Sequence, residues 1–237
     1  NHTLDQGQSG VNQTIANLDK AGIAHTGSWA SAKARSKPLI LNVNGVRIAW
    51  LAYTQMTNGI PSPHRWSVGI ASATTILRDA QVARKLGAQA VIVNVHGGDE
   101  YKHSPSPFQS SLAKRLTASP LITAVVGQHV HVVQPIRWVN GKPVVYGEGN
   151  LLSNQSSACC PAASQDGYLA LLHLRLADGT AKVSRVDYIP VWVRHPDFVV
   201  LPVRMARRKG LAPESDLKAS WIRTTRVVGS SPTIRPL

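Results

Sequence analysis

Two histidines one residue apart, His129 and His131, are the residues in this sequence most suggestive of chemistry. They follow an apolar run at 121–127 and lie within the segment VVGQHVHVVQP, residues 125–135. Alternating side chains point to opposite faces of an extended strand, but they can converge in a turn that follows a strand. Two converging imidazoles indicate a metal site or a proton-transfer site. The alternative is two unrelated polar residues in a loop, and this segment by itself leaves both interpretations open.

A third imidazole, His96, follows another apolar run, residues 90–95, which is typical of a strand buried on both faces. Helical periodicity at 108–118 separates the two runs, so the order strand, helix, strand predicts a parallel pair with a right-handed crossover. Parallel strands end at the same carboxyl edge, where open α/β sheets place their ligands. We therefore expect His96, His129 and His131 to converge there, and this favours a metal site.

The elements around this unit alternate between helices and hairpins. Amphipathic spacing predicts helices at 9–22, 69–87 and 213–228, and a loop is expected at 55–68. Strand pairs are expected at 38–54, 133–150 and 167–193, around the turns Asn44-Gly45, Asn140-Gly141 and Asp178-Gly179. After His195 the chain is rich in Pro, Arg and Ser, and outside 213–228 it is expected to be irregular.

Composition limits the class of protein. The 237 residues are 43% hydrophobic, which is enough for a single globular domain with an extension. No apolar run reaches the roughly 18–20 residues that a membrane span requires. We divide the chain into a domain at 1–193 and a basic extension at 194–237. Because the chain begins at Asn1 without Met or a signal-type segment, we also expect further sequence upstream.

The formal net charge of +14 favours a polyanionic partner. Basic residues concentrate at 203–210 and 221–229, which form either a solvated tail or a binding patch. No recognised nucleic-acid motif is present, so no nucleic-acid partner is expected. The adjacent Cys159 and Cys160 are expected to be free thiols, because neighbouring Cα atoms lie closer together than an unstrained disulfide requires.

Five short motifs follow one another along the chain: NHTLDQG (1–7), GVNQTIANLDKAGIAHTG (10–27), HGGDEY (96–101), GQHVHVVQPI (127–136) and YGEGN (146–150). In this order and spacing they resemble the bacterial CapA family of capsule-synthesis proteins, which is associated with poly-γ-glutamate and is similar to the calcineurin-like metallophosphoesterases. The resemblance covers roughly residues 1–190. It implies an α/β fold, a four-layer α/β/β/α sandwich of metallophosphoesterase type with mixed sheets, lacking the first strand–helix units.

The resemblance also implies a site for two divalent metal ions (Mn, Zn, Fe or Mg), although without the superfamily's carboxylates this chain is expected to bind metal weakly or at one site only. The positions that match the family's metal ligands are Asn1, His96, His129 and His131. His2 matches a catalytic imidazole, which fits the general acid that protonates a leaving oxygen in phosphoester cleavage. Asp5 and Glu100 match positions with supporting roles. For Asn1 and His2 the alternative is a poorly tethered chain end.

Two departures from the family pattern bear on activity. The Asp-x-His motif and the bridging Asp of the superfamily have no counterpart in this chain, and a two-metal site needs an anionic bridge. Gly97 stands where the family usually has an aromatic residue, which changes the wall of the cleft.

Two functions therefore stay open: a metal-dependent phosphoesterase-like hydrolase, or a non-catalytic cell-envelope component that binds or guides an anionic polymer. The implied partners are an anionic polymer or a phosphoester substrate, together with other capsule-synthesis proteins at the membrane. The implied location is the cell envelope or the extracellular face. Asn150 is either near the cleft or part of a turn. The remaining histidines carry no motif and are expected at the surface or beside the site: His25, His64, His103, His173 and His195.

Overall fold

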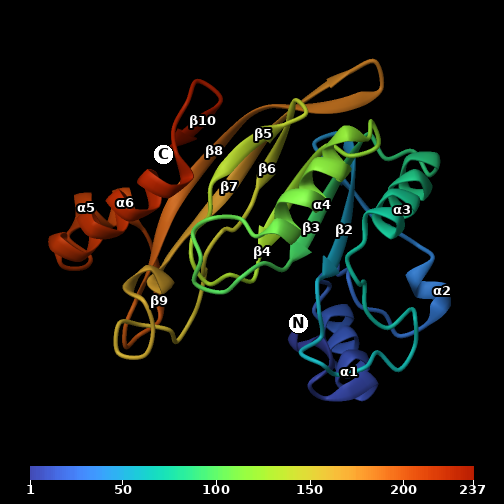
Figure 1. Ribbon diagram of the computed structural model, residues 1–237, viewed down its shortest axis with the longest axis horizontal. Helices are drawn as coiled ribbons and strands as arrows, with labels where there is room; N and C mark the ends of the chain where they lie inside the picture. Colours follow the sequence, from blue (N-terminus) through green and yellow to red (C-terminus); the bar gives the residue numbers. More distant parts are fainter.

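Two β-sheets packed face to face form the centre of the molecule, which the computed structural model describes over residues 1–237 (Figure 1). The larger sheet has the order β1-β2-β3-β4-β6-β5; its four inner strands are parallel, and β1 and β5 are antiparallel hairpin partners at the edges. Its strands are β1 (Leu39–Val43), β2 (Val46–Thr54), β3 (Ala90–His96), β4 (Ala124–Gln128), β5 (Ile136–Val139) and β6 (Lys142–Val145).

The second sheet has the order β10-β8-β7, and β9 also pairs with β8. β10 is parallel to β8, whereas β7 and β9 are antiparallel to it, so both sheets are mixed. Its strands are β7 (Asp166–Ala177), β8 (Thr180–Arg194), β9 (Val199–Pro202) and β10 (Ile234–Pro236). The core between the sheets includes Ile92 of β3, packed in one cluster with the edge-to-face pair Tyr168 and Tyr188.

Two helices, α3 (Ala73–Lys85) and α4 (Pro107–Ala118), cover the other face of the larger sheet. Their apolar faces contribute the fully buried Ile76 and Leu116 to the largest core cluster, and truncating such a side chain to Ala typically costs about 2–5 kcal/mol. Ser106 starts α4 with a reciprocal capping box to Gln109. This helix follows β3 and returns the chain to the start of β4. β3 and β4 are parallel, so the predicted strand–helix–strand unit is confirmed.

The C-terminal helices α5 (Val203–Lys209) and α6 (Glu214–Val228) pack against β8 and β9 around Trp192. In Figure 1 they lie beyond β8, on the side of the molecule opposite to α3. Leu169 and Leu171 of β7, which point away from the inter-sheet core, stay about 40% exposed, at 41% and 40%. The predicted α/β class with two mixed sheets between helices is confirmed, and the outer helical layer leaves this part of β7 uncovered.

The predicted turns are confirmed at all three hairpins. Asn44, Asn140 and Asp178 each have a positive φ and are followed by a glycine, as a two-residue turn between twisted strands requires. The helices expected at 9–22 and 69–87 form as α1 (Gly7–Lys20) and α3, the latter starting later because Ser72 caps it. Shorter helices are α2 (Ala32–Arg35), η1 (His2–Leu4) and η2 (Ala162–Gln165).

One expectation about the C-terminal region was wrong. Residues after His195 are not irregular outside α6, because β9, α5 and β10 also form there. The reason is the long β8, whose backbone pairs with β9 and β10. Cys159 and Cys160 are free, as expected. None of the helices combines the length and the apolar character that a membrane crossing requires.

Candidate functional site

The candidate site lies at the carboxyl edge of the larger sheet. His96 is the last residue of β3, and His129 follows directly after Gln128, the last residue of β4. The register pairs His96 with Gln128, so the two parallel strands end side by side. The expected delivery of both imidazoles to one edge is confirmed, and it follows from the parallel topology.

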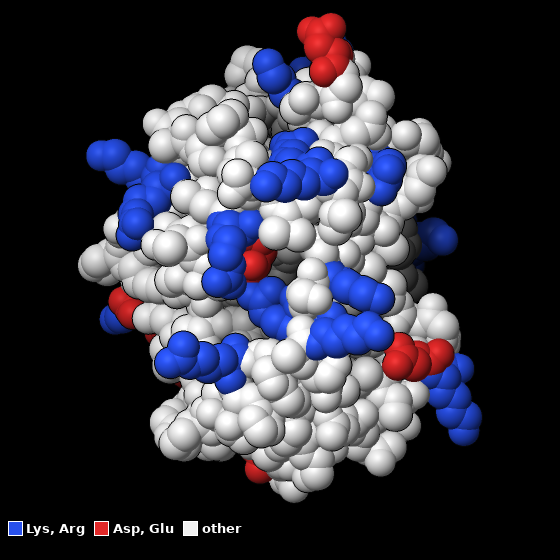
Figure 2. All heavy atoms as spheres, turned by 90° about the vertical axis from the view of Figure 1, so that its right-hand side faces the viewer, with Lys and Arg blue, Asp and Glu red and all other residues white.

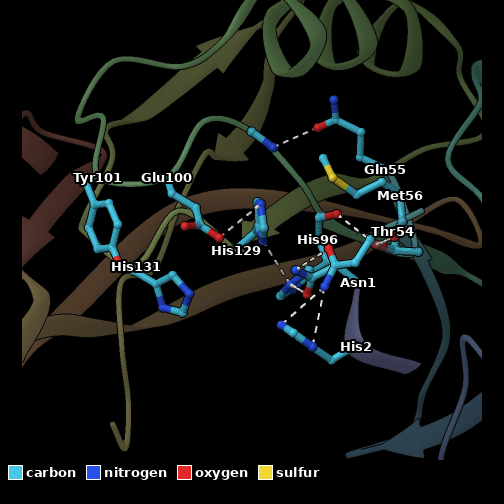
Figure 3. A network of polar contacts seen from close by, with 12 residues as sticks. Asn1, His2, Thr54, Gln55, Met56, His96, Glu100, Tyr101, His129 and His131 are labelled. Carbon is cyan, nitrogen blue, oxygen red and sulfur yellow. Dashed lines mark hydrogen bonds and ion pairs between the residues drawn. The ribbon is translucent and has the colours of Figure 1, made fainter. Parts of the chain in front are cut away.

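Three side chains meet at this edge. Asn1 Oδ1 lies 2.9 Å from His96 Nε2, and His129 Nδ1 lies 3.2 Å from the same nitrogen. Figure 3 shows Asn1, His96 and His129 pointing toward one another, although they come from three distant parts of the chain. We call these three residues the histidine cluster.

The backbone that carries the two spaced histidines is strained. His129 and His131 have φ values of 107° and 59°, in the left-handed region that side chains other than glycine rarely adopt. Val130 between them is buried, and its carbonyl oxygen accepts a hydrogen bond from Tyr101 N at 2.8 Å. This turn therefore aims both imidazoles at the same edge, at a conformational cost typical of functional sites.

His131 lies beside the cluster rather than within it. Its ring centroid is 6.4 Å from that of His129, and it stacks on Tyr101 with centroids 5.9 Å apart. Its Nδ1 lies 3.0 Å from Asn150 Oδ1. The structure thus brings His96, His129 and Asn1 into direct contact and leaves His131 one ring further away.

His2 is held at the open side of the cluster. Its Nδ1 lies 2.7 Å from Asp5 Oδ2, and Asn58 Nδ2 lies 3.3 Å from its Nε2. The side chain of His2 is 71% exposed, so it can reach a ligand from solvent. The adjoining Leu4 is buried, packing with Val11 and Val68, and this anchors the segment to the rest of the protein.

Burial sets the charge of the two central imidazoles. Burial, with smaller contributions from the Asn1 amino group and the neighbouring imidazoles, lowers the pKa of His96 to about 4. Burial also lowers the pKa of His129, against the opposing effect of Glu100, whose Oε1 lies 3.9 Å from His129 Nε2. Both rings are therefore neutral at pH 7, and a neutral imidazole is the form that binds metal ions.

The donor atoms fit a single divalent ion in part. Two ligands about 2.0–2.2 Å from one ion lie about 3 Å from each other, which is the spacing of His96 Nε2 from Asn1 Oδ1 and from His129 Nδ1. No group of three or more His, Cys, Asp or Glu side chains is arranged to hold a metal. Asp5 contacts His2 instead, and Glu100 is 46% exposed, so neither carboxylate joins the cluster.

Gly97 is explained by its neighbours. A Cβ at this position would lie 2.8 Å from Gln55 Cβ and 3.2 Å from Phe108 Cε1. These two side chains occupy the space that any larger side chain at this position would need. The sequence departure at Gly97 therefore leaves the donor atoms of the cluster unaffected.

Sequence reasoning missed the roles of Asn58 and Tyr101 and left that of Asn150 open. Asn150 ends the segment YGEGN, and this motif could have indicated a place near the site. Asn58 lies in a loop that carries no motif. Each of the other histidines has a partner outside the cluster: His25 with Asp19, His64 with Trp66, His103 with Val133, His173 with Asp187, and His195 with Phe198.

Comparison with known proteins adds a family match. The model of the family described as "Bacterial capsule synthesis protein PGA_cap" matches residues 1–155. The capsule biosynthesis protein CapA of Bacillus anthracis is 30% identical over 196 residues, 81% of this chain and 46% of that protein. The PGA biosynthesis protein CapA of Bacillus subtilis is 28% identical over 190 residues, 79% of this chain and 49% of that protein.

A probable polyglutamine synthesis accessory protein of Mycobacterium tuberculosis is 26% identical over 237 residues, 95% of this chain and 59% of that protein. The chain thus spans about half the length of the curated relatives that it matches.

Two solved structures align at 16% identity. They are the Haemophilus influenzae NAD nucleotidase (TM-score 0.46; 100% of this chain, 46% of that chain) and the Bacillus subtilis calcineurin-like phosphoesterase YfkN (0.41; 78% and 57%). At TM-scores below 0.5 these alignments establish no common fold.

Proposed function

The chain belongs to the bacterial capsule synthesis protein family PGA_cap, and we propose that it is a CapA-like protein of poly-γ-glutamate capsule synthesis with a metal-dependent phosphoesterase-type site. The single observation that carries the site is the contact of Asn1 and His129 with His96 Nε2, at 2.9 and 3.2 Å. Neutral imidazoles and an amide oxygen at one sheet edge are a donor set suited to a divalent ion.

In this proposal Asn1, His96 and His129 would hold a divalent ion of Mn, Zn, Fe or Mg, and His131 would contribute its Nε2. A bound divalent ion supplies positive charge that stabilises the negative charge developing on a phosphoryl group. The chain's own residues position the ester beside that charge. The lack of a carboxylate in the cluster favours one ion over two, because two adjacent dications need an anionic bridge.

His2 is proposed as the general acid. Asp5 accepts a hydrogen bond from Nδ1, 2.7 Å away, which orients the ring with Nε2 toward the open side. When the ring is protonated, its Nε2 proton is the one donated to the leaving oxygen, which then takes the place of Asn58 Nδ2 beside that nitrogen. Glu100 is proposed to support His129, since its carboxylate favours the proton on the facing nitrogen.

The family also directs the proposal for partners and location. Capsule biosynthesis and polyglutamine synthesis are named for the relatives. We therefore propose that this chain acts at the cell envelope with other capsule-synthesis proteins, on an anionic polymer or a phosphoester. Residues 1–193 are proposed as the functional domain and 194–237 as its basic extension.

A second function is favoured by the same site. Because Asp5 and Glu100 stay out of the cluster, the donor set lacks the carboxylates expected of a two-metal hydrolase. A non-catalytic component that binds or guides the polymer needs no such carboxylate. The charge of +14 suits an anionic ligand in either case.

The deciding experiment is turnover of p-nitrophenyl phosphate and its diester, with Mn²⁺, Zn²⁺ or Mg²⁺ at matched loading. It compares this chain and the product of its complete open reading frame with their His2→Ala and His129→Ala variants. His2→Ala is expected to keep the metal and lose about 10²–10⁴-fold in kcat, whereas His129→Ala loses metal and activity together. No turnover by either unsubstituted protein with any ion supports the non-catalytic function, and equal turnover in all variants contradicts the assigned site.

A further inference from the structure

A second candidate site is a half-open pocket of about 560 Å³ under α2 and α3, against the outer face of β2. Figure 2 shows the side of the molecule that carries α3 in Figure 1, with Lys and Arg side chains gathered around a hollow and an acidic group beside it. The cations that line the pocket are Arg35, Lys37, Arg65 and Arg78, and the acid is Asp79. The volume lies within the range of small-ligand pockets.

The charges of the pocket do not balance. Asp79 is paired with Arg35 at 2.5 Å and with Arg78 at 3.3 Å, and it is largely buried. The side chains of Lys37 and Arg65 form no ion pair or hydrogen bond, and both are exposed at the rim. Four cations against one carboxylate leave the pocket strongly positive, with two cations free to meet a ligand.

Side-chain contacts hold the floor of the pocket in place. The hydroxyl of Tyr53 donates to Asp79 Oδ2 at 2.8 Å, and burial and the adjacent carboxylate hold the pKa of Tyr53 well above its ordinary value. The guanidinium of Arg35 lies 4.4 Å from the ring centroid of Trp29, which is buried. Asp79 therefore holds Arg35 in place, and Lys37 and Arg65 remain unpaired for a ligand.

Apolar side chains line the pocket together with the cations. Nine of the nineteen lining residues are hydrophobic, and they include Trp29 and Trp66. Trp66 is braced by His64, whose ring stacks on it with centroids 4.5 Å apart. Such side chains accept methylene groups, so the pocket suits a ligand with anionic groups spaced along an aliphatic chain.

The pocket is separate from the histidine cluster. None of Asn1, His96 and His129 lines it. It opens on the helix-covered face of the larger sheet, whereas the cluster lies at the carboxyl edge of β3 and β4. A ligand in the pocket would leave the cluster accessible.

We propose that this pocket binds a segment of a carboxylate-bearing chain, a glutamate oligomer, as a docking site distinct from the histidine cluster. The choice of glutamate rests on the proposed function in capsule synthesis. The carboxylates meet Lys37 and Arg65, and the methylenes lie against the tryptophan side chains. A bidentate arginine–carboxylate contact gives more affinity than an exposed charge at a distance.

The test is isothermal titration of a short γ-linked oligoglutamate into the protein, the Lys37→Gln/Arg65→Gln variant, and a charge-matched control, Arg175→Gln/Lys218→Gln. All four positions are exposed, so the fold is expected to survive, and thermal melts verify this. The pocket variant is expected to bind about tenfold more weakly than the unsubstituted protein, and the control to bind as well as that protein. Inorganic phosphate is expected to compete poorly, because it lacks the aliphatic part.

Equal weakening in the control overturns the proposal, because general charge attraction then explains binding. Strong competition by phosphate also overturns it, since the pocket would then be a simple anion site. A third arm, His129→Ala, separates the proposals: weakening there but not in the pocket variant places the polymer at the histidine cluster and overturns only the docking site. If the unsubstituted protein shows no phosphoester turnover but its oligoglutamate binding still depends on Lys37 and Arg65, the hydrolase proposal is overturned and the docking site is supported. Absence of any binding overturns the docking site.

Discussion

The side chain of Asn150 fixes the tautomer of His131. Asn150 Oδ1 lies 3.0 Å from His131 Nδ1, and its Nδ2 donates to the carbonyl oxygen of Ser164 at 2.8 Å. A carbonyl only accepts, so the amide nitrogen must face Ser164 and the amide oxygen must face the imidazole. His131 Nδ1 therefore carries the proton, and its Nε2 keeps a lone pair directed away from Asn150.

This relationship predicts that Asn150→Ala weakens divalent-metal binding by about 10–100-fold, the usual effect of removing the partner that orients a ligating imidazole. Titration calorimetry with Zn²⁺ and Mn²⁺ measures the change, and a thermal melt shows whether the variant is folded. The matched control is Asn154→Ala, at an exposed position in the same loop. Equal metal affinity of the folded Asn150→Ala variant and the unsubstituted protein would show that the amide has no such role.

The donor geometry predicts one bound ion per chain rather than two. His96→Ala and His129→Ala each remove a donor that lies within 3.2 Å of another donor, so each is expected to abolish tight binding. His25→Ala is the control, because His25 contacts Asp19 outside the cluster. Metal analysis after exhaustive dialysis measures the stoichiometry, and two tightly held ions per chain would contradict the prediction.

The lowered pKa of His96 predicts a pH dependence of stability in chelator-treated protein. The folded-state pKa is about 4 and the ordinary value is 6.5, so between these values the unfolded chain binds more protons. Stability must then fall as the pH drops from about 6.5 to about 4, by at most about 1.4 kcal/mol per pH unit from this group. Urea unfolding at several pH values measures the slope, and His96→Gln is expected to flatten it. An unchanged slope in that variant would assign the effect to other groups.

The ion pair of Arg223 with Asp166 predicts that the C-terminal helices stabilise the sandwich. Arg223 Nε and Nη2 contact the carboxylate at 2.6 and 2.9 Å, and Asp166 is completely buried at the start of β7. Arg223→Met leaves that acid without its cation and is expected to lower the free energy of unfolding by about 3 kcal/mol. Urea unfolding measures the loss.

Two further variants test the cause of that loss. Adding Asp166→Asn to Arg223→Met is expected to restore part of the stability, because the buried group is then neutral. Arg226→Met, at an exposed position one turn along α6, is expected to change stability by less than about 0.5 kcal/mol. A loss in Arg226→Met equal to that in Arg223→Met would point to helix propensity instead of the ion pair.

The sequence by itself determined the local elements and the edge at which the site forms. The apolar runs before His96 and His129, with a helix between them, predicted parallel strands whose carboxyl ends meet, and periodicity and turn chemistry do not depend on distant contacts. The hairpin at Asn140-Gly141 was equally predictable, since its turn residues tolerate a positive φ. The family motifs in their order were also readable without a structure.

Tertiary structure decided which side chains meet and what charge they carry. Asn58 contacts Asn1 and His2 across more than fifty residues, and no local pattern encodes such a contact. The exclusion of Asp5 and Glu100 from the cluster and the low pKa of His96 depend on distances and burial that exist only in the folded chain. The cation-lined pocket likewise joins α2, β2 and α3 through long-range packing, because charge and burial are properties of the assembled surface rather than of any segment.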